Sequence, residues 1–200
     1  LEHWQGKLKW SPPVLQVPLD RTRPPRATFD CRVVRTTLSV ELVDGLAALA
    51  LPQAPVGHDA RQTSVAGALL AAFTVLLARL SGENDLVIGT VFSGRDFPGN
   101  NGVIGPLADW LLLRLNIDRA KDSFSDVVQR SRIELLSAIG HQNMPFALLL
   151  NKLTNADAAN QQQIDHTPLF AVLFVLASQL GRRSNLAKPA ILESRLAPHD

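Results

Sequence analysis

Two kinds of hydrophobic pattern alternate along the chain. Between residues 65 and 80, leucine, valine and alanine recur every three or four positions, which predicts a helix with a wide apolar face. Residues 86–92 and 169–176 are instead almost continuously apolar, as in strands that lie in sheets covered on both faces. Residues 111–117 place leucine or isoleucine at every second position and predict a further strand. Because helices and buried strands are interleaved, we expect an α/β fold, a layered sandwich in which helices flank a mixed β-sheet.

Residue types that begin or end helices divide the rest of the chain. Serine and threonine accept hydrogen bonds at helix N-termini, glycine permits the left-handed turn that ends many helices, and proline fits the first helical position. We expect helices to be opened by Ser39, by Thr63 or Ser64, by Ser123 and by Pro145, and the long helix to end at Gly82.

The first part of the chain is less regular. Residues 1–8 predict a short helix with its apolar residues on one face. Residues 9–30 form a proline-rich connector, expected to run extended because proline supplies no backbone donor. Residues 31–38 carry β-branched residues between arginines and predict a half-exposed strand. The chain begins inside the first helix without a methionine, so we expect it to be a piece of a longer polypeptide.

Composition and charge narrow the classes of function. Hydrophobic residues make up 46% of the chain and charged residues 19%, which is enough apolar material for a packed core. The net charge is only +2, and the densest basic stretch, residues 21–26, is broken by proline, so we do not expect nucleic acid as a partner. The longest apolar run, residues 65–78, is shorter than the ~20 residues that span a bilayer, which argues against membrane insertion.

The residues alone indicate no disulfide, metal site or phosphate-binding loop. Cys31 is the single cysteine, which fits a reducing, cytoplasmic setting and rules out an intrachain disulfide. The five histidines are scattered and none stands four residues from another, so we expect no metal site. Residues 89–94 resemble a phosphate-binding loop only superficially, because Arg95-Asp96 replaces the required Lys-Ser/Thr pair.

Several polar residues in apolar surroundings have both a structural and a functional interpretation. His141 stands at the end of a predicted helix, where it fits a C-terminal cap, and a general base is the alternative. Arg114 interrupts a leucine-rich strand and predicts a structural ion pair, since a buried arginine needs a partner. Asp109 and Trp110 begin that strand, and their residue types fit the surface and a pocket equally well.

Five segments of the sequence match, in order and with natural spacing, the motifs of one protein family. The segments and motifs are residues 17–24 against L-P-x-D-R-x-R-P, 86–95 against V-x-G-T-x-x-x-G-R, 104–114 against I-G-x-F-x-N-T-x-x-x-R, 141–147 against H-Q-D-x-P-F-E and 168–170 against P-L-F. The matched residues include Asp20, Arg21, Gly94, Arg95, Gly105, Arg114, His141, Gln142, Pro145 and Phe146. On these residues the chain resembles the condensation domains of nonribosomal peptide synthetases.

The resemblance implies a fold and a reaction. Condensation domains are V-shaped pairs of lobes related to chloramphenicol acetyltransferase, and they join an acceptor amine to a donor thioester. The family's catalytic motif, H-H-x-x-x-D-G, belongs to the N-terminal lobe, and the present sequence contains no H-x-x-x-D. The resemblance therefore implies that residues 1–200 are the C-terminal subdomain of such a domain, truncated at both ends, with no catalytic residue of its own.

The resemblance also implies partners. Both substrates of the family are tethered through phosphopantetheine to carrier proteins, so no cofactor would be bound directly by this chain. The implied partners are the N-terminal lobe of the same domain, peptidyl carrier proteins and an adenylation domain. Within the chain, the resemblance places Asp109 and Trp110 beside the substrate tunnel.

Several residues depart from the family's motifs. Asp109 and Trp110 replace an Asn-Thr pair, and Asn143 and Ala147 replace an Asp and a Glu. These departures leave open whether the parent domain forms peptide bonds. Epimerisation, cyclisation and ester formation occur on the same fold, and a carrier-docking module without catalysis is an alternative of a different class.

Overall fold

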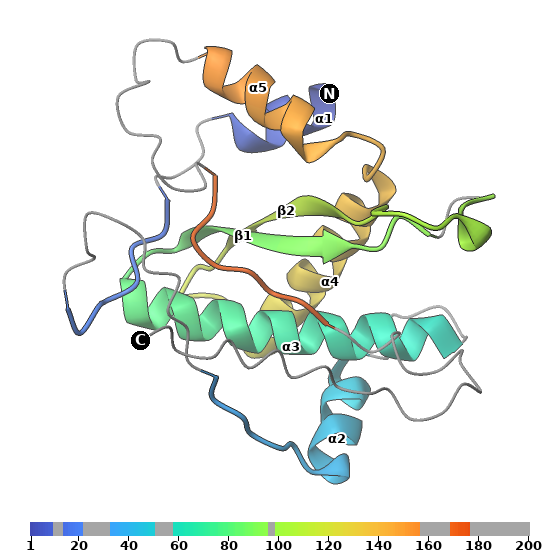
Figure 1. The fold of residues 1–200 in the computed structure, drawn as a ribbon. Coiled ribbons are helices and arrows are strands. Elements are labelled where there is room, and N and C mark those ends of the chain that lie inside the picture. Colours follow the sequence, from blue (N-terminus) through green and yellow to red (C-terminus); the bar gives the residue numbers. More distant parts are fainter. Residues whose placement is uncertain (10–13, 22–32, 51–57, 96–98, 157–168, 177–200) are drawn as a thin grey trace, which may run out of the picture.

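The computed structural model describes residues 1–9, 14–21, 33–50, 58–95, 99–156 and 169–176 (Figure 1). Within them the helices are α1 (Glu2–Leu8), α2 (Val40–Ala50), α3 (His58–Ser81), α4 (Phe124–Gly140) and α5 (Phe146–Ala156), and the strands are β1 (Asp85–Phe92) and β2 (Asp109–Asn116). A short 3-10 helix, Asn100–Gly102, lies in the connection between the two strands. Helices and strands are interleaved along the chain, as the hydrophobic pattern predicts.

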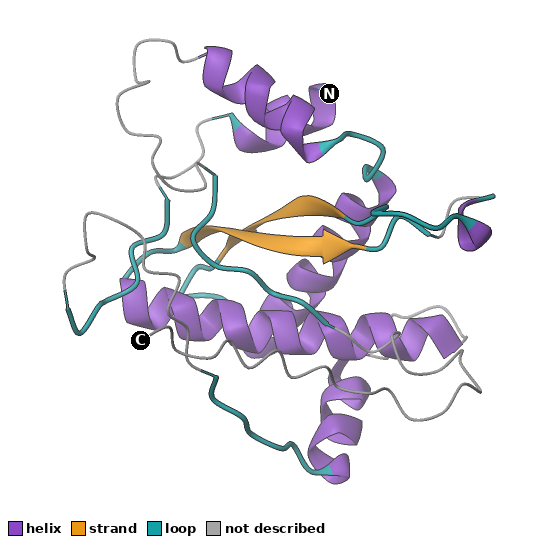
Figure 2. Cartoon of the chain, in the orientation of Figure 1, coloured by secondary structure: helices purple, strands orange, loops and turns teal. Residues whose placement is uncertain are grey.

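The sheet is built around β1. On one edge, β1 pairs antiparallel with β2 along its whole length. On the other edge, Gly89 donates its N–H to the Val172 carbonyl oxygen (3.0 Å) and accepts the Phe174 N–H (2.9 Å), so this segment runs parallel to β1. Helices α1 and α5 lie on one side of the strands and α3 on the other (Figure 2). The predicted layered α/β fold with mixed strand directions is therefore confirmed.

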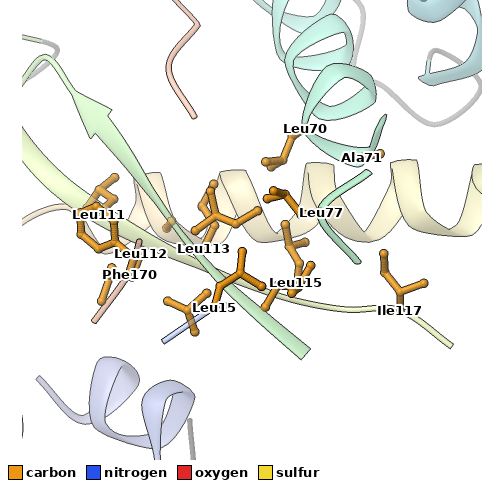
Figure 3. Packing of buried hydrophobic residues seen from close by; sticks show 14 of the residues in the cluster. Leu15, Leu70, Ala71, Leu77, Leu111, Leu112, Leu113, Leu115, Ile117 and Phe170 are labelled. Carbon is orange, nitrogen blue, oxygen red and sulfur yellow. The ribbon is translucent and has the colours of Figure 1, made fainter. Parts of the chain in front are cut away.

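The hydrophobic core joins the two strands to all of α1, α3, α4 and α5, and α3 contributes several of its buried side chains. Leu70 and Leu77 of α3 lie beside Leu113 and Leu115 of β2 (Figure 3), and all four side chains are at most 4% exposed. Burying one such side chain stabilises the fold by ~1.5–3 kcal/mol. Leu112 is fully buried as well. Both faces of β2 are therefore covered around Leu112, and the expected alternation of buried and exposed positions does not hold there.

Local signals set several helix ends where the sequence predicts them. The Ser39 hydroxyl accepts a hydrogen bond from a first-turn N–H of α2 at 3.2 Å. The Ser123 hydroxyl accepts the Asp126 N–H (3.3 Å), and the Asp126 carboxylate accepts the Ser123 N–H (2.9 Å), which is a complete capping box for α4. Gly82, with φ at +83°, follows the last residue of α3, and α5 begins directly after Pro145.

Two predictions from local pattern were wrong. Residues 33–38 form no strand and are exposed, Val34 at 95%. A strand is stable only when its backbone pairs with a neighbour, and no described strand runs beside this segment. Helix α3 begins at His58, so Thr63 and Ser64 lie inside it rather than at its start.

The strand predicted for the last apolar segment is only partly present. The pattern of residues 169–176 predicts a full strand, yet they pair with β1 only around Gly89.

Residues 14–21 of the proline-rich connector form no helix or strand, and Leu15 anchors them in the core at 3% exposure. Residues 22–32, which include Cys31, lie outside the described residues. No helix in the described part of the chain is long and apolar enough to cross a membrane.

Candidate functional site

A cleft of about 380 Å³ opens where the end of β1, the start of β2 and the turn between α4 and α5 meet. Its lining residues are Phe92, Gly94, Asn100, Leu107, Asp109, Gln142, Asn143 and Pro145. Three of the motif segments, 86–95, 104–114 and 141–147, thus contribute to one cavity although they are far apart in sequence. The cleft combines apolar walls with amide and carboxylate groups.

Gly94 gives the cleft part of its shape. Its φ of +66° is a conformation that side chains rarely adopt, and an added Cβ would lie only 2.2 Å from the Leu107 carbonyl oxygen. The Asn100 side-chain amide donates to the Gly94 carbonyl at 2.8 Å and holds the turn from the other side. Glycine at position 94 therefore lets the two ends of the β1–β2 connection approach each other closely.

Arg95 forms hydrogen bonds across the connection between β1 and β2. Its Nη1 donates to the Val103 carbonyl oxygen at 2.8 Å, and its Nη2 donates to the Gly105 carbonyl oxygen at 3.3 Å. A guanidinium group suits this role because it presents several donors in a fixed plane. Arg95 and Gly105 are therefore structural contributors to the loop beside the cleft.

Asp109 lines the cleft and also caps a helix. Its Oδ2 accepts the Phe146 N–H at 3.0 Å, and its Oδ1 accepts the Trp110 N–H at 2.8 Å. Phe146 is the first residue of α5, so the carboxylate satisfies one of the unpaired N–H groups at that helix end and complements its positive dipole. Asp109 thereby ties the start of β2 to the start of α5.

Three aromatic rings pack beside the cleft. The Trp110 ring lies 5.5 Å from the Phe170 ring and 6.5 Å from the Phe146 ring, and the two phenylalanine rings are 6.0 Å apart. Phe170 lies directly over Gly89, where an added Cβ would approach the ring to 2.5 Å. Trp110 remains 42% exposed, so one part of its surface faces away from these rings.

Arg114 forms the ion pair that the sequence predicts. Its Nη2 lies 2.7 Å from Asp85 Oδ2, and its Nε donates to Asp85 Oδ1 at 3.1 Å. Its Nη1 donates to the carbonyl oxygens of Lys7 (2.7 Å) and Lys9 (3.1 Å) at the end of α1. The hydrogen bonds and charge of Asp85 raise the pKa of Arg114. Arg114 thus fastens α1 to the sheet and does not line the cleft.

His141 caps α4 and meets a second histidine. Its Nδ1 lies 2.8 Å from the Ser137 carbonyl oxygen, and its backbone oxygen accepts the Trp4 Nε1–H at 3.2 Å. The His141 ring stacks on the His3 ring with centroids 3.5 Å apart and planes 4° from parallel. The cap agrees with the structural interpretation of His141, whereas no pattern in the sequence relates the two histidines. Within the described residues, no three histidine, cysteine or acidic side chains are grouped to hold a metal ion.

The charges around His3 oppose its protonation. Burial lowers the pKa of His3, and the neighbouring His141 and Lys7 lower it further, while Glu134 partly offsets them. The Lys7 ammonium lies 2.5 Å from the Glu134 carboxylate, so much of that negative charge is already paired. The unfolded chain would take up a proton at the ordinary histidine pKa of 6.5, whereas folded His3 takes it up only at lower pH.

We therefore expect the chain to lose stability as the pH falls below about 6.5, and His3→Phe to weaken this dependence. Phenylalanine keeps a flat ring for stacking but cannot bind a proton. The melting temperature of both proteins measured from pH 8 to pH 5 tests this, since Asp122, with a pKa near 2, titrates below that range. Parallel curves for the two proteins would contradict the role of His3.

The structure brings only some of the residues of the motif segments into the cleft. Gly94, Asp109, Gln142 and Pro145 line the cleft. Asp20 and Arg21 are exposed and are not among the residues that line it. Membership of a motif segment therefore does not by itself place a residue in the cleft.

Asn100 lines the cavity although it lies outside the motif segments, whereas Phe92 and Leu107 lie inside segments 86–95 and 104–114. Phe170, which ends the matched P-L-F segment, covers Gly89. Gly89 was an available signal, because a glycine inside an apolar strand often marks the close approach of another group. The loop residues carried no such signal, since their roles depend on the folded path of the β1–β2 connection.

The sequence matches known proteins over most of its length. Residues 1–195 match the family model of the condensation domain. The chain is 34% identical over 176 residues to phosphinothricin tripeptide synthetase PhsC of Streptomyces viridochromogenes, covering 88% of this chain and 15% of that protein. It is 32% identical over 176 residues to a linear gramicidin synthase polypeptide of Brevibacillus parabrevis, covering 88% of this chain and 3% of that protein. The chain thus spans only a small part of these relatives.

Solved structures share the fold. A four-domain nonribosomal peptide synthetase, holo-AB3403, superposes with a TM-score of 0.73 at 24% identity, covering 87% of this chain and 12% of that one. The X-domain from teicoplanin biosynthesis superposes with a TM-score of 0.66 at 23% identity, covering 86% of this chain and 35% of that one. Condensation domains have the chloramphenicol acetyltransferase-like fold. The family match over residues 1–195 and the similarity to peptide synthetases agree with the motif segments, and the chain belongs to the condensation domain family.

Proposed function

We propose that this chain is the C-terminal lobe of a nonribosomal peptide synthetase condensation domain and forms one wall of its substrate tunnel. The observation that carries the proposal is the match to the condensation domain over residues 1–195. In the proposed reaction, the nitrogen of an acceptor amine attacks the carbonyl carbon of a donor thioester. A C–N bond forms, the C–S bond breaks, and the nitrogen loses a proton as the carrier thiol leaves.

In this proposal the chain positions substrates and does not transfer protons. The sequence contains no H-x-x-x-D, so the histidine of the family's catalytic motif would come from the N-terminal lobe. Holding two tethered reactants in contact is itself catalytic, because it replaces an encounter between separate molecules. The partners would be that lobe, two peptidyl carrier proteins bearing phosphopantetheine, and the adenylation domain that loads them.

Asp109 and Trp110 are the proposed tunnel residues. Asp109 lines the cleft while its carboxylate accepts two backbone N–H groups, and this keeps the charge fixed in place. Each Asp109 oxygen keeps a further lone pair, so the fixed carboxylate can still orient an amine through a charge-assisted hydrogen bond, which is stronger than a bond to a neutral amide. Trp110 contributes a partly exposed ring beside it.

The isolated chain is expected to form no dipeptide when it is mixed with carrier proteins loaded with donor and acceptor amino acids. The reason is that positioned proton transfer contributes roughly 10²–10⁴-fold to such reactions, and the histidine motif that would supply it is not in this sequence. Mass spectrometry of the released products measures the outcome. A complete condensation domain in the same assay is the positive control, and dipeptide formation by this chain alone would contradict the proposal.

A carrier-docking or interaction module without catalysis is the second candidate. It is favoured by the structural likeness to the teicoplanin X-domain, which has also been solved in complex with OxyB and superposes there with a TM-score of 0.69. It is favoured too by Asn143 and Ala147 in place of the motif's Asp and Glu. A parent domain that binds loaded carriers without releasing any product would support this candidate. Epimerised, cyclised or ester products would assign a related reaction instead.

A further inference from the structure

The Gln142 side chain is the polar group of the cleft that the fold leaves unsatisfied. Its Oε1 atom is buried and has no hydrogen-bond partner among the described residues, although Gln142 lines the cavity. Leaving a buried acceptor unpaired destabilises the folded chain, so such an atom in a cleft points to a donor that arrives with a ligand. Gln142 lies in the turn between α4 and α5, directly after the His141 cap.

The neighbouring polar groups define what this ligand must offer. Both Asp109 oxygens already accept backbone N–H groups, and the Asn100 side-chain amide donates to the Gly94 carbonyl oxygen. Asn143 also lines the cleft but is exposed to water, so the buried unpaired atom is the Gln142 acceptor, which pairs with an N–H or O–H donor. Phe92, Leu107 and Pro145 provide apolar walls that suit methylene groups.

We infer that Gln142 is a positioning residue whose Oε1 accepts a hydrogen bond from a secondary amide N–H of the tethered substrate chain. The inference rests on the proposed function, because a carrier-tethered thioester is the ligand that brings such amides. A secondary amide flanked by methylene groups supplies both the donor and the apolar surface that the cleft accepts. Two sources carry this chemistry: the amides of the pantetheine arm, and the peptide N–H of a donor chain.

The test compares amide ligands with ester analogues that lack the N–H. The probes are pantetheine, a short N-acetyl dipeptide, and for each an analogue in which oxygen replaces the amide nitrogen. Binding to the ¹⁵N-labelled chain is followed by NMR at the backbone amide signals of Gly94, Asn100 and Asp109, which line the cleft and are present in every variant. We expect the chain to bind one amide probe about tenfold more tightly than its ester analogue, as one hydrogen bond to a buried acceptor would give. The probe that shows this preference identifies the source.

Substitutions of Gln142 distinguish a role in positioning the ligand from a role in stabilising the fold. Gln142→Leu leaves a branched apolar side chain but removes the acceptor, so the preference for amide over ester is expected to disappear. Gln142→Glu keeps an acceptor oxygen and is expected to retain the preference. Gln5→Leu, an exposed change on α1, is the control and should match the original chain. A purely structural role of Gln142 would change the melting temperature and leave the amide preference intact.

The outcomes distinguish this inference from the proposed function. The inference is overturned if no amide probe binds at millimolar concentration, if amides and esters bind equally, or if Gln142→Leu keeps the preference. The proposed function fails separately, when the complete parent domain releases no condensation product. An amide preference that depends on Gln142, together with a catalytically silent parent domain, would leave the chain as an amide-recognising docking module.

Discussion

Replacing Arg114 with methionine is expected to lower the free energy of unfolding by about 2–3 kcal/mol. The substitution removes the ion pair with Asp85 and the hydrogen bonds to two carbonyl oxygens at the end of α1, those of Lys7 and Lys9. The Arg114 side chain is 23% exposed, so we place the loss below the ~3–5 kcal/mol of a fully buried pair. Urea unfolding followed by circular dichroism measures the change.

Arg79→Met is the matched control for this experiment. Arg79 is exposed on α3, so the same chemical change there is expected to shift the free energy of unfolding by less than about 0.5 kcal/mol. Asp85→Asn, alone and combined with the Arg114 substitution, isolates the ion pair, because the two losses should not add. Additive losses would contradict a stabilising ion pair between Arg114 and Asp85, and an Arg114 variant as stable as the Arg79 variant would show that Arg114 does not stabilise the fold.

Replacing Gly94 with alanine is expected to destabilise the chain by about 2–4 kcal/mol and to alter the cleft. Two costs combine, since alanine is strained at a φ of +66° and its Cβ would lie 2.2 Å from the Leu107 carbonyl oxygen. The obstructing atom belongs to the backbone, so the β1–β2 connection itself has to move. The same unfolding experiment measures the loss, and the cleft signals in the NMR spectrum report the movement.

Gly102→Ala serves as the control because it lies in the same connection. An added Cβ at Gly102 would meet nothing within 4 Å, so this variant should keep the stability of the original chain. Equal stability of the Gly94 and Gly102 variants would mean that Gly94 and Leu107 do not approach each other closely in solution. Loss of stability in both would mean that the loop tolerates no added side chain for a reason other than the Leu107 contact.

The sequence by itself determined the features that depend on near neighbours. The apolar period of residues 65–80 places α3, the continuous run 86–92 places β1, and Ser123 with Asp126 opens α4. These signals are local because helix periodicity and capping involve residues only three or four positions apart. The ordered motif segments are also a property of the sequence alone, and they suffice to indicate the family without any knowledge of the fold.

Only the tertiary structure decided which segments pair and what lines the cleft. Residues 33–38 have strand-like composition but lie exposed, because strand formation depends on a neighbour that the local sequence does not specify. The stack of His3 on His141, and the contact of Asp109 with the first turn of α5, join residues far apart in the chain. The unpaired acceptor of Gln142 is likewise not evident from the sequence, since its burial and its lack of a partner are properties of the folded chain.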